Sequence, residues 1–188
     1  ELSVSNLSSS VDFEGDPLVW LGAGGLEESI SFLDATYKKA GSSELKEYLL
    51  MAIGLHSESP RAIGFMKEVL LGTGEEDLRE DAAFWLCQTQ TDEARKILLE
   101  TAWKDRSEDV REKAIFSMSQ MDAGQVVDDI IALAKGHTDT ETRKKAAFWL
   151  GQKASEKAVG ALKDIAYKDE DTEVQKSAMF ALTQLEDG

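Results

Sequence analysis

The sequence predicts an all-α, right-handed solenoid, a superhelix built from antiparallel helix pairs. Similar segments return every 32 or 33 residues, apolar residues recur with the spacing of a helix, and the chain of 188 residues has only two prolines. The repeated segments are LKEYLLMAIGLH (45–56), LREDAAFWLCQT (78–89), VREKAIFSMSQM (110–121), TRKKAAFWLGQK (142–153) and VQKSAMFALTQL (174–185). Short helices that repeat in this way bury their apolar faces by stacking on their neighbours.

Equivalent positions of these segments form columns of similar residues. A small column reads Leu49, Ala82, Ala114, Ala146 and Ala178. An apolar column on the other side reads Met51, Phe84, Phe116, Phe148 and Phe180. A glutamine column reads Gln88, Gln120, Gln152 and Gln184. These columns predict the first helix, helix A, of each repeat.

A second periodic stretch follows each helix A and predicts a helix B. Its core column reads Leu33, Phe65, Leu98, Ile130 and Leu162. Short breaks separate the two helices of a repeat, and longer acidic breaks separate one repeat from the next. Ser107, Asp139 and Asp171 precede the starts of A helices, where a side-chain oxygen can accept a hydrogen bond from the first free N–H groups. Each unit therefore reads as helix A, tight turn, helix B and acidic loop.

The repeat register divides the chain into a tail and one array. We expect a tail or cap over 1–15 and a single array over 16–188. The predicted units are a degenerate repeat at 16–42, full repeats at 43–74, 75–106, 107–138 and 139–170, and a truncated repeat at 171–188. Since the last unit stops before its helix B, we expect a longer array, or another molecule that covers this open C-terminal end.

The helix A phrase resembles the HEAT repeat, an armadillo-like fold, and in particular the short bacterial type called the PBS lyase HEAT-like repeat. The phrase is hydrophobic-Arg-x-x-Ala, present at 78–82 and 110–114, and at 142–146 with threonine first. Lys46 and Gln175 replace the arginine in the first and last of these segments. The resemblance implies a scaffold that holds protein partners. Some relatives assist chromophore attachment, and another branch removes damaged DNA bases through a basic groove.

Composition limits the other function classes. The net charge is −15, which opposes sequence-independent nucleic-acid binding, and no apolar run is long enough to cross a bilayer. One cysteine and two distant histidines form no metal or catalytic constellation, so we expect no metal, no cofactor and no catalytic residue. We expect Cys87 to be a small packing residue, and His56 and His137 to be surface or capping residues. Residues 19–27, VWLGAGGLE, resemble a dinucleotide loop but carry Glu27 where its third glycine belongs.

Two surfaces are candidates for partner binding. On the helix B face, which we expect to be concave, the candidates point away from the core: Lys96, Glu100, Trp103, Asp128, Asp164 and Tyr167. On the helix A face, the candidate is a stripe of Phe84, Phe116, Phe148 and Phe180. Packing between repeats is the alternative for the phenylalanines, and also for Trp103 and Tyr167.

The sequence therefore favours a non-catalytic scaffold for protein–protein interaction. Residues 1–94 carry 18 acidic and 6 basic residues, whereas residues 95–188 carry 18 and 15, so the N-terminal half would attract a basic protein or peptide more strongly. The alternatives are an accessory subunit of chromophore-lyase type, or a nucleic-acid-binding protein. We expect no membrane insertion, and both a cytoplasmic and an exported, periplasmic location fit the sequence.

Overall fold

Ten α-helices account for most of the described chain. The computed structural model describes residues 25–122, 124–153 and 155–186, and it contains no strand within these ranges. The helices are α1 (Leu26–Tyr37), α2 (Ser43–Gly54), α3 (Pro60–Leu70), α4 (Glu76–Gln88), α5 (Asp92–Lys104), α6 (Glu108–Ser119), α7 (Val126–Gly136), α8 (Thr140–Leu150), α9 (Glu156–Lys168) and α10 (Thr172–Glu186). The tail at 1–15, the glycine loop before Gly25 and the start of the repeat at 16–42 lie outside these ranges.

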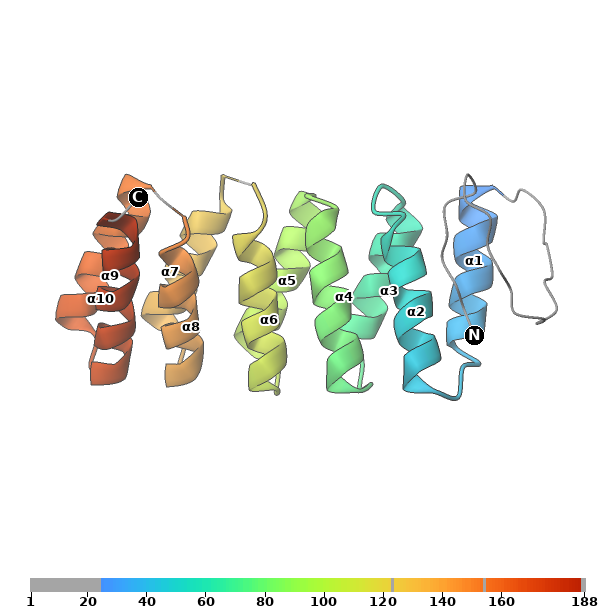
Figure 1. Cartoon of the computed structure of the whole chain (residues 1–188), viewed down its shortest axis with the longest axis horizontal. Helices are drawn as coiled ribbons and strands as arrows, with labels where there is room; N and C mark the ends of the chain where they lie inside the picture. Colours follow the sequence, from blue (N-terminus) through green and yellow to red (C-terminus); the bar gives the residue numbers. More distant parts are fainter. Residues whose placement is uncertain (1–24, 123, 154, 187–188) are drawn as a thin grey trace, which may run out of the picture.

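The helices form an elongated array of two layers, in which the chain alternates between the layers (Figure 1). The A helices α2, α4, α6, α8 and α10 form one layer, and the B helices α1, α3, α5, α7 and α9 form the other. Successive A helices pack closely along their lengths, while successive B helices contact each other much less. The predicted all-α solenoid is confirmed. The repeat boundaries given above remain our proposal for dividing it.

The core lies between the two layers. The fully buried residues include Leu50 and Leu86 from A helices and Leu98, Ile130 and Leu162 from the predicted B column. Burying an aliphatic side chain of this kind contributes roughly 1.5–3 kcal/mol. The array thus has one continuous core that runs from α1 to α10.

Local sequence sets where the helices begin. Ser107 accepts a hydrogen bond from the N–H of Val110, and Asp139 accepts one from Thr142, so the predicted N-caps are confirmed. Asp171 accepts a hydrogen bond from the N–H of Glu173, in the first turn of α10. These side chains satisfy N–H groups that have no partner within the helix.

Small residues let the A helices approach each other. Gly54 at the end of α2 lies under the indole of Trp85, and a Cβ at Gly54 would stand 2.4 Å from that ring. A Cβ at Gly151 would stand 2.8 Å from the Cβ of Ala181 on α10. Cys87 occupies the same place in α4 as these glycines and is fully buried, as expected for a packing residue.

The arginine of the repeated phrase joins neighbouring repeats. Arg79 donates to the carbonyl of Leu70 before its own helix and pairs with Asp105 in the next loop. Arg143 does the same with the carbonyl of His137 and the carboxylate of Asp169, at 2.9 and 3.3 Å. Because these arginines are buried or nearly so, each ion pair fixes one inter-repeat loop to the next.

His137 caps the C-terminus of α7, which is one of the two roles expected for it, but it is buried and not a surface residue. Its exposed fraction is 7%, and it stands in the loop position that Asp105 and Asp169 hold in the adjacent repeats. Its Nδ1 accepts a hydrogen bond from the N–H of Asp139, as Asp105 accepts one from Ser107. Arg111 pairs instead with Asp139 and donates to Thr142. The histidine is buried because it replaces an aspartate in an inter-repeat loop that the repeated arginines hold in place. We use the name arginine ladder for Arg79, Arg111 and Arg143.

Candidate protein-interaction surfaces

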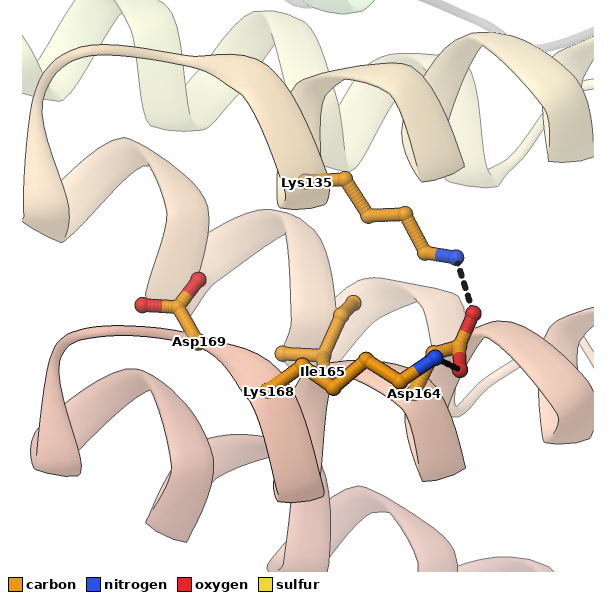
Figure 2. Close-up of a pocket in the computed structure, with 5 residues that line it drawn as sticks. All are labelled: Lys135, Asp164, Ile165, Lys168 and Asp169. Atoms are coloured by element: carbon orange, nitrogen blue, oxygen red, sulfur yellow. Dashed lines mark hydrogen bonds and ion pairs between the residues drawn. The ribbon is translucent and has the colours of Figure 1, made fainter.

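The predicted charged residues of the B face are already paired with neighbouring charges. Figure 2 shows Asp164 of α9 between two lysines, with its carboxylate oxygens 2.9 Å from Nζ of Lys135 and 2.8 Å from Nζ of Lys168. Hydrogen bonds from Lys135 and then Lys168 lower the pKa of Asp164 to about 2. The two lysines lie at the ends of α7 and α9, where a cation also stabilises the helix dipole.

The remaining predicted charges of this face have partners of the same kind. Lys96 lies 2.6 Å from Asp92, and Glu100 lies 3.0 Å from Lys104, both one turn apart on α5. Asp128 pairs with Lys157 across α7 and α9. Exposed pairs such as these contribute about 0–1 kcal/mol, so a partner can displace them, but the B face offers no excess charge at these residues.

The two aromatic candidates of the B face do not form a pair. In the repeat register Lys135 stands between Trp103 and Tyr167. Trp103 packs on His137, with ring centroids 5.3 Å apart, and its side chain is 36% exposed. Tyr167, which directly precedes Lys168 in the sequence, is 85% exposed. The first residue therefore contributes to packing between repeats, and the second is a single exposed ring.

On the A face, the four phenylalanines lie on successive helices and are all accessible. Phe84 and Phe180 are exposed, at 36% and 53%, whereas Phe116 and Phe148 are half-buried. They point away from the core between the layers. We use the name A-face stripe for Phe84, Phe116, Phe148 and Phe180.

Two tryptophans that sequence reasoning missed pack beside the A-face stripe. Trp149 lies between Phe116 and Phe148, with centroids 4.9 and 5.0 Å away, and Phe148 stacks on Phe180 at 6.3 Å. Trp85 lies 5.4 Å from Phe84 on α4. The signal was present, because the phrase AAFWL occurs at 82–86 and again at 146–150. The result is a nearly continuous aromatic surface over α6, α8 and α10, with a second patch on α4.

Carboxylates gather at one end of this surface. A hollow of about 360 Å³ over α6 is lined by Glu80, Asp109, Glu112, Lys113, Phe116 and Trp149. Burial raises the pKa of Glu80, and the neighbouring Asp109, Asp77 and Asp81 raise it further against the opposing effect of Lys113. Burial also raises the pKa of Asp81. Negative charge is therefore held here in a partly dehydrated setting.

The glutamine column next to the stripe does not bond from one repeat to the next within the described chain. The amide of Gln88 donates to Sγ of Cys87, and that of Gln120 donates to Ser119, each on its own helix. A different glutamine connects repeats: Gln90, whose φ is 51°, accepts a hydrogen bond from the N–H of Asp122. A sequence pattern cannot reveal this contact, because it depends on the left-handed turn after α4.

The part of the chain that the structure describes contains no group of three His, Cys, Asp or Glu side chains placed to hold a metal ion. Burial raises the pKa of the Cys87 thiol, which keeps it in its unreactive form. No helix of the described residues is long and apolar enough to cross a membrane.

The stacked helix pairs with a continuous core define an α-solenoid. Residues 127–187 match the family model described as HEAT repeats. The C-terminal third of the chain is thus similar to HEAT repeats. Comparison with curated protein sequences found no significant match.

Two solved structures share the fold. Human deoxyhypusine hydroxylase in complex with glycerol is 22% identical with a TM-score of 0.57, and the match covers 86% of this chain. It covers 63% of the hydroxylase chain, so this chain spans less than two thirds of that protein. The complex of CpcE and CpcF of phycocyanin lyase from Nostoc sp. is 13% identical with a TM-score of 0.57, with 83% of this chain and 99% of that chain covered. At these identities the likeness concerns the fold.

Proposed function

We propose that this chain is a non-catalytic scaffold that binds a protein or peptide segment through the A-face stripe. The observation that carries the proposal is the accessible phenylalanine on each of four successive A helices, in addition to the buried columns that already form the core. An aromatic surface that the core does not require is typical of a binding site.

The rigidity of the array supports this proposal. The arginine ladder and the close packing of the A helices hold the aromatic side chains on a preformed surface. A preformed surface loses less conformational entropy on binding than a flexible one. The CpcE–CpcF complex is an example of a protein of this fold assembled with another protein.

Charge favours the A face over the B face as the principal surface. At the predicted B-face residues each charge has an intramolecular partner. On the A face the carboxylates of Glu80, Asp109 and Glu112 outnumber the lysines that pair with them, Lys113 and Lys145. Negative charge at this surface repels phosphate groups, so the partner in this proposal is a protein and not a nucleic acid. The B-face residues remain the secondary candidate, with Tyr167 as their exposed aromatic group.

Site-specific photo-crosslinking tests the proposal. The photoreactive residue benzoylphenylalanine would replace Phe84 or Phe148 on the A face, and Tyr167 on the B face as the matched control. The proteins would be irradiated in lysate of the source organism, and the products identified by mass spectrometry. We expect the same partner to crosslink from both A-face positions and not from position 167. Crosslinking from position 167 alone would contradict the choice of face, and none from any position would contradict the scaffold.

A further inference from the structure

A hollow lies at the α6 end of the aromatic surface. The A helices carry Trp85 on α4 and Trp149 on α8, but the equivalent position on α6 is Ser117, which is small and buried. The hollow lies over this helix, with Phe116 and Trp149 in its wall. It therefore has room for a side chain from outside, next to the exposed rings of the A-face stripe.

The charges around the hollow do not balance. Its lining contributes three carboxylates, those of Glu80, Asp109 and Glu112, and one ammonium group, that of Lys113. Lys113 lies 3.8 Å from Glu80, and Lys145 from the next helix lies 2.7 Å from Glu112. Asp77 and Asp81 add negative charge from α4. One further cation in the hollow would offset repulsion that now exists among these carboxylates.

The aromatic wall also favours a cation. The rings of Phe116 and Trp149 lie 4.9 Å apart, and the ammonium group of Lys113 already stands 6.0 Å from the ring of Phe116. A cation over an aromatic ring is attracted by the negative face of the ring, most strongly where water is excluded. Guanidinium groups are planar and stack on such rings while they bond to carboxylates.

We infer that the hollow over α6 receives an arginine or lysine side chain from a partner polypeptide whose neighbouring apolar side chains lie on Phe148 and Phe180. This inference rests on the proposed function and adds the chemistry of the partner. Carboxylates at one end of an apolar stripe also fix the direction in which the segment lies, because its basic residue must face α6. The partner is thus a basic segment with apolar anchors.

Free peptides test the inference directly, because it concerns only the chemistry of the bound segment. A random library of displayed 12-residue peptides would be selected on the folded chain, and the enriched peptides measured by fluorescence anisotropy. Each peptide would be compared with a copy in which citrulline, a neutral isostere, replaces arginine, or norleucine replaces lysine. Two protein variants of equal charge change serve as a matched pair: Glu80→Gln at the hollow and Asp164→Asn on the B face.

We expect the enriched peptides to combine basic and apolar residues, and to lose about tenfold in affinity when the cation is neutralised, as in the loss of one charge-assisted contact. Glu80→Gln would weaken binding about as much, while Asp164→Asn would leave it unchanged. Peptides that bind without a basic residue, or that respond to Asp164→Asn and not to Glu80→Gln, would overturn the inference and leave the scaffold standing. A selection that enriches no binding peptide would overturn both.

Circular dichroism distinguishes a binding role of Glu80 from a structural role. Because burial and like charges raise the pKa of Glu80, its carboxylate opposes folding at neutral pH. Glu80→Gln should therefore raise the urea midpoint of the free chain while it weakens the peptide complex. A variant that lost both stability and binding would show that Glu80 serves the fold, and the inference would fail.

Discussion

Arg79→Gln tests whether the arginine ladder holds the repeats together. The Arg79 and Asp105 side chains are only 3% and 7% exposed, so removing the cation leaves a carboxylate in a dehydrated loop. Breaking a buried pair from one side costs about 3–5 kcal/mol. Glutamine keeps part of the contact, because Gln175 in the last repeat donates to the carbonyl of Asp169 at 2.7 Å. We therefore expect a loss near the lower end, about 3 kcal/mol.

Urea unfolding followed by far-ultraviolet circular dichroism measures this loss of stability. The dependence of the unfolding free energy on urea concentration should stay unchanged, which shows that the same cooperative unit unfolds. Lys46→Gln is the matched control, since Lys46 holds the same repeat position without being buried, and it should cost less than about 0.5 kcal/mol. The double variant Arg79→Gln with Asp105→Asn should recover most of the loss, because no charge is then left without a partner. A loss below about 1 kcal/mol for Arg79→Gln, or a double variant as unstable as the single one, would refute the reasoning.

Other substitutions test packing, charge and the B face. Gly54→Ala should lower the free energy of unfolding by about 1–3 kcal/mol, because its Cβ would meet Trp85. Gly160→Ala on α9 has open space around it and should raise that free energy by roughly 0.5–1 kcal/mol. Equal effects of the two variants in urea unfolding would contradict the packing described. The Asp164 carboxyl should titrate near pH 2 in a carbon-13 nuclear magnetic resonance experiment, because its pKa is lowered to about 2. Its ion pairs therefore persist below pH 4 and are lost only as the pH falls through about 2. Lys135→Met should raise the pKa of Asp164, and an unchanged pKa in this variant would refute the pairing. Tyr167→Ala should leave the urea midpoint unchanged, whereas Trp103→Ala should lower it through the lost contact with His137; a stable Trp103→Ala array would show that this residue is free for binding.

Most of the fold could be predicted from the repeat register. Each repeat contains the same local signals, and these predict two helices per 32 residues and the buried apolar columns. They also predict the N-caps at Ser107 and Asp139. The arginine of the phrase was visible as a pattern, but its bonds were not, because they reach into loops whose shape depends on the stacking of repeats. The burial of His137 could not be predicted for the same reason.

The candidate site was less accessible to sequence reasoning. The periodicity located the phenylalanines correctly on a separate side of helix A, yet it could not give their exposure, which depends on how closely the A helices pack. The charges of the B face looked available in sequence, but long lysine side chains reach across one turn or one repeat to neutralise them. The hollow over α6 is lined by side chains from α4, α6 and α8, so no single motif in the sequence could reveal it.

The indole resonances of the tryptophans test the central claim most directly. Trp85 and Trp149 lie on the A face, while Trp103 lies between B helices beside His137. Titrating a selected basic peptide into nitrogen-15-labelled protein would report on each indole N–H separately. The account predicts that the Trp149 resonance shifts in proportion to binding while that of Trp103 stays in place. A shift of Trp103 with Trp149 unmoved would place the partner on the B face and contradict the account.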